Sequence, residues 1–158
     1  MIHDEMPGIN DHLNDSCRVS YTGFDPTSDS LHIGSLVPIM LLAHFQRSGH
    51  KPIVLIGGAT GMIGDPSGKS SERNLLDKKI LFKNQESIKK QLSHFLNFDS
   101  KVKNSALVLN NFDWMSKFTL LEFIRDIGKH ISVDYMMSKD SVKNRISSES
   151  SSGMSFTE

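Results

Sequence analysis

The sequence predicts the first half of a doubly wound α/β sheet, in which parallel strands alternate with helices. Residues 53–56 form a continuous apolar run after an expected helix, which is typical of a buried parallel strand. A strand, a helix and a second strand of these lengths make a βαβ unit with a right-handed crossover. The length of 158 residues suits one domain. Ligands of such sheets bind at the carboxyl ends of the strands.

The chain begins with a polar segment, residues 1–17, for which we expect little regular structure. A short strand over residues 18–21 should lead into a turn at Gly23 and Pro26. The strand would end close to Tyr21, so this tyrosine should lie near the edge of the sheet where ligands bind.

The first long helix should run from about residue 31 to residue 48, with Asp29 or Ser30 as its N-cap. Pro38 lies inside that range, so we expect a kink or a lost hydrogen bond there. Gly49 should end the helix, and the proline shortly after it should confirm the break.

The remaining elements continue the alternation. They are a glycine-rich loop over residues 57–68, an amphipathic helix over 84–98, a strand over 106–109, a helix over 119–128 and two helical pieces within 132–146. The inward side chains of the helix over 84–98 should be Ile88, Leu92, Phe95 and Leu96. A serine-rich loop and the start of an unfinished element occupy residues 147–158.

Composition excludes several classes of protein. Lys and Arg number 18 and Asp and Glu also number 18, so no basic excess announces a nucleic-acid surface. The single cysteine, Cys17, excludes an intramolecular disulfide and fits a reducing compartment. The apolar runs are far shorter than the ~20 residues that span a bilayer, and the N-terminus is not that of a secretory signal. The cytoplasm is therefore the expected location.

The segment over residues 21–35 carries the clearest functional signal. A strand and a Pro-containing turn precede His32 and Gly34, which fall at the start of the long helix. A helix N-terminus attracts anions, a glycine lets a ligand approach the backbone, and a histidine can donate a hydrogen bond to a phosphate oxygen. By itself, however, a histidine in this place is more often a capping or surface residue.

The residues of this segment also resemble a family pattern. His32-Ile-Gly-Ser35 resembles the "HIGH" signature of class I aminoacyl-tRNA synthetases. The accompanying motifs occur in order: Tyr21-Thr-Gly-Phe-Asp-Pro-Thr27, Gly57-Gly-Ala-Thr-Gly-Met-Ile-Gly-Asp-Pro-Ser67, Asn110-Asn-Phe-Asp-Trp114, Arg125-Asp-Ile-Gly-Lys-His130 and Gly153-Met-Ser-Phe-Thr157. Together they resemble the bacterial tyrosyl-tRNA synthetases, from about Val19 to the last residue. The resemblance implies a Rossmann-like (HUP-type) sheet and assigns residues 18–146 to part of the catalytic domain.

The resemblance implies catalytic roles for four residues. His32 and Thr27 would bind the β- and γ-phosphates of ATP and stabilise the leaving pyrophosphate. Lys69 and Arg73 lie four residues apart and would share a helix face, from which they would reach pyrophosphate. A solvated charged surface is the alternative for these two cations.

Further residues would bind the substrates. The resemblance assigns the substrate phenol to Tyr21, the substrate ammonium to Asp65 and a supporting role in the tyrosine pocket to Asn111. It places Thr22, Gly23, Asp25, Gly34 and Ser35 around ATP, although Ser35 departs from the second histidine usual in the signature. The alternatives are a half-buried strand aromatic for Tyr21 and turn-forming polar residues for Asp65, Asp25 and Thr22.

The implied activity is tyrosine–tRNA ligation, a step of protein biosynthesis. Tyrosine would attack the α-phosphate of ATP, with Mg²⁺ accompanying the nucleotide, and the tyrosyl group would then pass to tRNA. The residues that resemble the family's dimer interface are 119–128, Lys129, His130 and the segment near Phe156, so we expect a homodimer. We expect no metal site, because His130 has no ligand spacing with other residues.

The sequence leaves three alternative functions open, and it also limits what this chain should do by itself. The alternatives are a tryptophanyl relative, a non-catalytic nucleotide-binding or dimerisation module, and a P-loop ATPase. The last is disfavoured because Gly64-Asp-Pro-Ser-Gly-Lys-Ser70 has three residues before its Gly-Lys pair where the motif needs four. The family continues beyond Glu158 with a KMSKS-type loop and a tRNA-binding domain, so we expect this chain to be an inactive fragment by itself.

Overall fold

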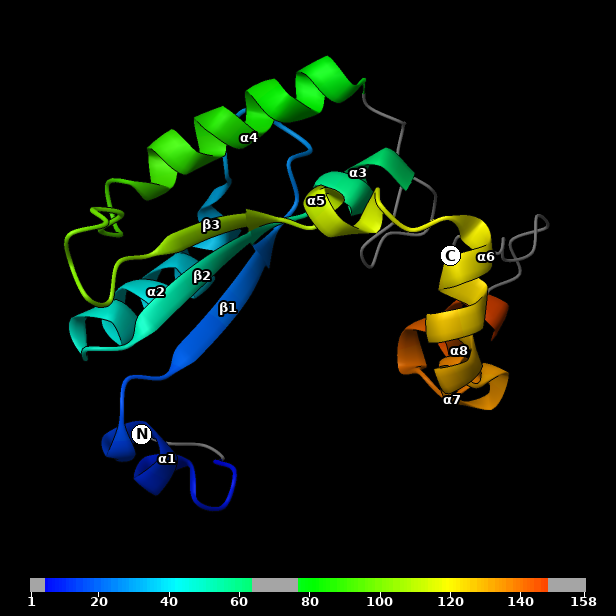
Figure 1. The fold of residues 1–158 in the computed structure, drawn as a ribbon, viewed down its shortest axis with the longest axis horizontal. Coiled ribbons are helices and arrows are strands. Elements are labelled where there is room, and N and C mark those ends of the chain that lie inside the picture. The colour runs from blue at the N-terminus through cyan, green and yellow to red at the C-terminus, as the bar shows by residue number, and fades with distance from the viewer. Residues whose placement is uncertain (1–4, 64–76, 148–158) are drawn as a thin grey trace.

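The sheet has three parallel strands in the order β1-β2-β3 (Figure 1). The structure is a computed structural model of the chain, and it describes residues 5–63 and 77–147. The strands are β1 Val19–Phe24, β2 Lys51–Ile56 and β3 Leu107–Asn110. An open parallel sheet joined by helices confirms the predicted α/β class.

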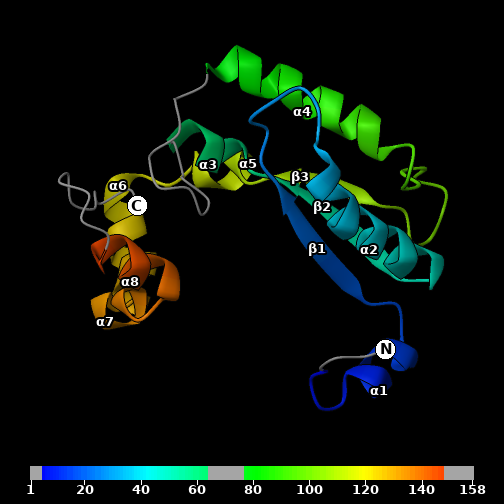
Figure 2. The ribbon, with the colours of Figure 1, turned by 180° about the vertical axis from the view of Figure 1, so that it is seen from behind.

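The two long helices cover the same face of this sheet. They are α2, Leu36–Arg47, between β1 and β2, and α4, Lys78–Leu92, between β2 and β3. Right-handed crossovers that advance in one direction across a sheet put their helices on one side of it. Figure 2 shows α2 in front of the sheet and running along the strands, with α4 above β3. The core between the helices and the sheet consists of Phe24, Ile39, Leu42, Ala43, Val54, Ile56, Ile88, Leu92, Leu96 and Ala106.

The other face of the sheet is open in the described part of the chain. Alternate residues of a strand point to opposite faces, so Val19, Tyr21 and Gly23 of β1 point away from the helices. Their side chains, and those of Leu107 and Leu109 on β3, are exposed. Each half of a doubly wound sheet carries its own helices on one face, which accounts for this arrangement.

The first long helix begins later than predicted. A short 3-10 turn, Ile33–Ser35, precedes α2, and His32 rather than Asp29 or Ser30 caps that turn. Pro38 is therefore the third residue of α2, where helix N–H groups have no partner, so it costs no hydrogen bond. Gly49 ends the helix as predicted, with a φ of +90° that favours glycine.

Several other boundaries also differ from prediction. β1 continues to Phe24, so Gly23 lies within the strand and not in a turn. Pro52 follows the end of α2 as predicted, and it is the second residue of β2, before the pairing with β3 begins at Ile53. The expected loop after β2 contains a short helix, α3 Gly58–Ile63, and the N-terminal segment contains α1 Ile9–Asp15.

The helix α4 begins earlier and ends earlier than predicted. The carboxylate of Asp77 caps it by accepting a hydrogen bond from the N–H of Lys79. Ile88, Leu92 and Leu96 are buried as predicted. Phe95 is 37% exposed, because the helix ends at Leu92 and no longer fixes its direction.

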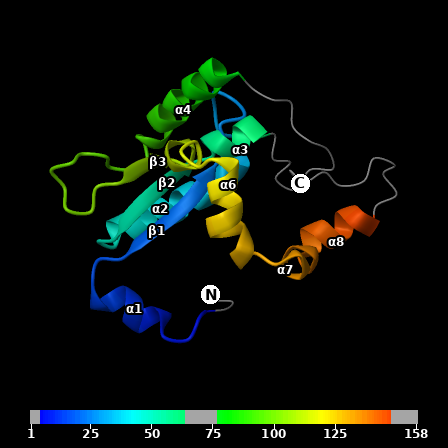
Figure 3. The ribbon, with the colours of Figure 1, turned by 45° about the vertical axis from the view of Figure 1, so that its right-hand side comes forward.

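The residues after β3 form a series of short helical pieces. They are α5 Phe112–Met115, α6 Leu120–Glu122, a π-helical turn Phe123–Ile127, a 3-10 turn Gly128–His130, α7 Val133–Met137 and α8 Asp140–Ser147. The predicted helix over 119–128 is thus broken into α6 and the π turn. We call residues 118–147 the C-terminal helical segment; it extends away from the sheet (Figure 3). Within the described residues, no helix is both long and apolar enough to cross a membrane.

Candidate functional site

The three strands end level with one another at one edge of the sheet. Phe24, Ile56 and Asn110 are register partners and are the last residues of their strands. The chain segments that leave this edge are the loop over residues 25–32, the turn at Gly57 and the turn at Asn111. The motifs that begin at Tyr21, Gly57 and Asn110 therefore reach the carboxyl edge, where α/β sheets bind ligands.

His32 is held by a hydrogen bond to the backbone that follows it. Its Nδ1 atom accepts a hydrogen bond from the N–H of Gly34 at 3.0 Å. An imidazole nitrogen that accepts carries no proton, so the proton of the neutral ring lies on Nε2. The ring is exposed, and its Nε2–H is a donor that can meet a ligand.

Gly34 lies directly against the ring of His32. A Cβ atom at this position would lie 2.8 Å from Cε1 of His32. The absent side chain therefore makes room for the protein's own imidazole. Ser35, next in the chain, is half-buried and makes no capping hydrogen bond at the start of α2.

The loop over residues 25–32 is close to the turn after β2. A Cβ atom at Gly57 would lie 2.7 Å from Oδ1 of Asp25, so the half-buried Asp25 approaches the backbone there. The hydroxyl of Thr60 donates to the carbonyl of Gly57 at 3.0 Å and stabilises the same turn. Thr27 is exposed two residues beyond Asp25.

Asn111 holds the start of α3. Its Oδ1 atom accepts a hydrogen bond from the N–H of Ala59 at 2.7 Å. This amide is at the N-terminal end of α3, where backbone donors otherwise lack a partner. Asn111 thus fixes the segment that leads from β2 into residues 64–76.

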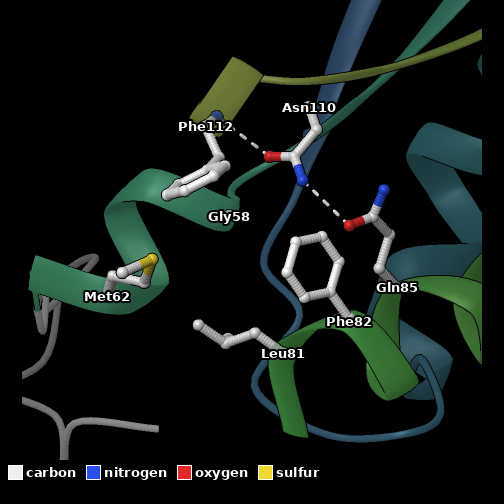
Figure 4. A pocket seen from close by; sticks show the side chains of 7 residues that line it. All are labelled: Gly58, Met62, Leu81, Phe82, Gln85, Asn110 and Phe112. Carbon is white, nitrogen blue, oxygen red and sulfur yellow. Dashed lines mark hydrogen bonds between the residues drawn. The ribbon is translucent and has the colours of Figure 1, made fainter. Parts of the chain in front are cut away.

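Asn110 belongs to a small pocket between α3, α4 and α5 (Figure 4). Its Oδ1 accepts from the N–H of Phe112 at 3.0 Å, and its Nδ2 donates to Oε1 of Gln85 at 2.8 Å. Its amide also lies against Gly58, where a Cβ atom would clash. The lining is mostly apolar: Gly58, Met62, Leu81, Phe82, Gln85, Asn110 and Phe112. None of the predicted site residues within the described part of the chain is among them.

Tyr21 is separated from the loop of His32. It is the third residue of β1, paired with Ile53, and its side chain is 69% exposed on the open face of the sheet. The expectation that it ends its strand is wrong, because β1 is longer than predicted. Tyr21 and His32 line neither the pocket at Asn110 nor a second pocket between α1 and the turn before β2.

The neighbours of Tyr21 divide between the two faces of the sheet. Gly23 shares the open face with Tyr21, and a Cβ atom there would meet nothing within 4 Å. Thr22 is half-buried on the helix-covered face, as strand alternation requires. Of the residues predicted to bind substrates, Tyr21 and Gly23 therefore border open space on one side, and Thr22 does not.

Three predicted site residues lie outside the described residues. They are Asp65, Lys69 and Arg73. The motif over residues 64–70 and Phe156 also lie outside the described residues. In the parts of the chain that are described, no group of three or more His, Cys, Asp or Glu side chains is arranged to hold a metal ion.

The C-terminal helical segment carries local charge interactions. The backbone N–H and, to a smaller extent, the hydroxyl of Thr119 bond the Glu122 carboxylate and lower its pKa. The guanidinium of Arg125 donates two hydrogen bonds to Asp126 and lowers the pKa of that carboxyl. These groups lie on the C-terminal helical segment, so they act there and not at the carboxyl edge of the sheet.

Sequence reasoning missed two polar residues of α4. Asn84 and Gln91 are hydrogen-bonded to the loop over residues 25–32. The available signal was their spacing, because Asn84, Ile88 and Gln91 follow an i, i+4, i+7 pattern and so share the inward stripe of the helix. A polar residue on an apolar stripe needs a partner inside the protein.

Comparisons with known proteins point to one family. A family model described as tRNA synthetases class I (W and Y) matches residues 14–158. The tyrosine–tRNA ligase of Porphyromonas gingivalis is 64% identical over 158 residues, which are 100% of this chain and 37% of that protein. The tyrosine–tRNA ligase of Parabacteroides distasonis is 63% identical with the same coverage. The chain thus spans little more than a third of the length of these curated relatives.

Solved structures show the same fold. A C-terminally truncated mitochondrial tyrosyl-tRNA synthetase of Aspergillus nidulans is 33% identical, with a TM-score of 0.71 over 89% of this chain and 41% of that chain. The corresponding Coccidioides posadasii structure is 30% identical, with a TM-score of 0.71 over 96% of this chain and 42% of that chain.

Proposed function

Because the chain belongs to the family of class I tRNA synthetases (W and Y), we propose that it forms part of the catalytic domain of a tyrosine–tRNA ligase. The observation that carries the proposal is the 64% identity, along the whole chain, to a protein of that name. The complete ligase would join the carboxylate of tyrosine to the α-phosphate of ATP and release pyrophosphate. It would then transfer the tyrosyl group to the terminal hydroxyl of tRNA.

The loop over residues 25–32 would bind the phosphates of ATP. His32 offers its Nε2–H because Nδ1 is already bonded to Gly34, and Thr27 offers a hydroxyl five residues earlier. Both donors would strengthen as negative charge gathers on the leaving pyrophosphate. Fixed donors of this kind stabilise a transition state because they need no reorganisation. Mg²⁺ would arrive with ATP as part of the substrate.

The cations Lys69 and Arg73 would complete the contacts to pyrophosphate. The resemblance to the family supports these roles, since both residues lie outside the described part of the chain. Gly34 and Ser35 would add contacts at the start of α2, and Thr22 and Asp25 would lie around the ribose. The half-buried Asp25, against the turn at Gly57, is suitably placed at the carboxyl edge.

The open face of the sheet would receive tyrosine. Tyr21 supplies a phenol that can exchange a hydrogen bond with the substrate phenol, and Gly23 leaves space for the ligand beside it. Asp65 would hold the ammonium group. Asn111 would act indirectly, since its bond to Ala59 fixes the start of the segment that carries Asp65.

The C-terminal helical segment would form a homodimer interface. Its apolar side chains are widely exposed, among them Leu120, Leu121, Ile124, Val133, Tyr135 and Met137. Exposed apolar surface of this extent is typical of an interaction site. A cytoplasmic location and binding of tRNA would follow from the ligase activity.

The test is a chimera in which this chain replaces the matching segment of the Porphyromonas gingivalis ligase. We expect tyrosine-dependent exchange of pyrophosphate into ATP, and no exchange when tryptophan replaces tyrosine. The parent ligase is the matched control. A folded chimera that exchanges with tryptophan, or that only hydrolyses ATP, contradicts the proposal.

A further inference from the structure

The helix α4 makes two hydrogen bonds to the loop over residues 25–32. Oε1 of Gln91 accepts from the N–H of Leu31 at 2.9 Å, directly before His32. Nδ2 of Asn84 donates to the carbonyl of Pro26 at 2.9 Å, directly before Thr27. The loop runs up to α4 and back down to α2 (Figures 1 and 2).

These bonds fix the two ends of the same loop from one rigid element. Asn84 and Gln91 are seven residues apart, which is about two turns of helix and about 10.5 Å along its axis. Between the bonded backbone atoms, Ser28, Asp29 and Ser30 are exposed and belong to no helix or strand. The separation of the two attachment points on α4 therefore sets the separation of Thr27 and His32.

The bond between Asn84 and Pro26 is buried, and this limits the positions that the loop can take. Asn84 is 5% exposed and Pro26 is fully buried, whereas the neighbouring inward residues Leu81, Ile88 and Leu92 are apolar. A buried amide that lost its partner would be costly, so Asn84 can occupy this stripe only while the Pro26 carbonyl faces it. The loop therefore has one favourable position relative to α4.

We propose that Gln91 and Asn84 are positioning residues that hold Thr27 and His32 at the spacing needed to grip the phosphates of ATP. The inference rests on the proposed function. Electrostatic stabilisation depends on donors that are already in place, and a displacement of about 1 Å can lower a rate about 100-fold. Neither residue touches the reacting atoms.

The test uses the chimera described above with paired substitutions. Gln91→Met keeps a similar length and removes the acceptor, whereas Gln91→Glu keeps an acceptor for Leu31. Asn84→Leu keeps a similar volume and removes the donor to Pro26. Ile88→Val is the control, because it loosens the packing of α4 and keeps both hydrogen bonds from α4 to the loop. The measurements are pyrophosphate exchange, ATP affinity by calorimetry, the KM for tyrosine and the melting temperature.

We expect Gln91→Met and Asn84→Leu to lower kcat/KM for ATP about 10- to 100-fold, with the KM for tyrosine unchanged. Gln91→Glu should restore most of the loss, and Ile88→Val should lower the melting temperature alone. A purely structural role predicts instead that all variants lose both substrates in proportion to their stability. That result, or unchanged ATP kinetics and affinity in Gln91→Met, overturns the inference.

Failure of the proposed function gives a different result. An unsubstituted, folded chimera that neither exchanges pyrophosphate nor binds ATP overturns the proposed function and this inference with it. An active chimera whose ATP parameters resist both substitutions overturns only the positioning role.

Discussion

His32 performs two tasks with its two ring nitrogens, and substitutions can separate them. His32→Asn places an oxygen near the position of Nδ1, so it can still accept from the N–H of Gly34, but it has no group at the position of Nε2. His32→Gln reaches the Nε2 position and loses the cap. His32→Ala loses both. The structure joins Nδ1 to Gly34 at 3.0 Å, so the two tasks belong to different atoms.

The expected magnitudes differ between the two tasks. Loss of one donor to a developing negative charge lowers kcat by about 100- to 1000-fold, so His32→Asn should lose that factor in pyrophosphate exchange by the chimera. Loss of a capping bond costs about 1 kcal/mol. Hydrogen–deuterium exchange of a peptide that contains Gly34 should therefore quicken about fivefold in His32→Gln and His32→Ala, but not in His32→Asn.

The combination of the two assays can refute the reasoning. If His32→Asn retains full exchange activity with the Gly34 amide protected, Nε2 does not stabilise the transition state. If His32→Gln leaves the protection of Gly34 unchanged, the bond to Nδ1 does not hold the loop. Thr27→Ser is a matched control, because it keeps a hydroxyl in the same loop.

The remaining predictions concern substrate recognition, the core and pH. Tyr21→Phe should raise the KM for tyrosine by up to about tenfold, through loss of a bond worth about 0.5–1.5 kcal/mol, and leave the KM for ATP unchanged; an unchanged KM for tyrosine would place phenol recognition elsewhere. Ile88→Ala, at a side chain with 0% exposure, should lower the free energy of unfolding by about 2–5 kcal/mol in urea denaturation, and a value below that range would argue against the packing of α4 on the sheet. The pKa of Glu122 is lowered from 4.5 first by the backbone N–H of Thr119 and second by its hydroxyl, so Thr119→Ala, which removes only the hydroxyl, should raise this pKa toward 4.5 without reaching it when followed by NMR. Because this folded pKa is lowered, the bonds from Thr119 to Glu122 should stabilise the folded state fully above pH 4.5, and this stabilisation should disappear as the pH falls through the folded pKa. A Glu122 pKa of 4.5 in the unsubstituted chain would contradict this.

The apolar strand β2 and the inward side of α4 could be predicted from the sequence because their signals are local. The apolar run in β2 and the spacing of Ile88 and Leu92 in α4 need only a few neighbouring residues to interpret. The start of α2 was missed for a physical reason. Asp29 and Ser30 are good caps by type, but the imidazole of His32 already bonds the first free N–H group.

Only part of the candidate site could be predicted, because the rest depends on contacts between residues far apart in the chain. Its motif residues are local and could be named, whereas the bonds that place them span long separations in the chain. Asn84 to Pro26 spans 58 residues and Gln91 to Leu31 spans 60. Such pairs depend on how α4 packs over the sheet, and that packing is a property of the whole sheet. The length of β1 has the same origin, because pairing with β2 continues to Phe24 and leaves Tyr21 within the strand.

The glycines of the motifs differ in what an added Cβ atom would meet. An added Cβ atom would meet the ring of His32 at Gly34. It would meet Asp25 and Thr60 at Gly57, and Asn110 at Gly58. At Gly23 it would meet nothing within 4 Å.

Substitution by alanine at Gly23 and Gly34 should therefore have opposite effects. Gly23→Ala should leave the stability of the fold intact, since alanine fits a strand at least as well as glycine, and should weaken ligand binding at the open face. Gly34→Ala should displace the His32 ring, which an added Cβ would approach to 2.8 Å, and should expose the Gly34 amide to exchange. Calorimetry with ATP and tyrosine, together with hydrogen exchange, measures both effects in the chimera. If Gly23→Ala binds both ligands with unchanged affinity, the space over β1 is not where the substrates meet.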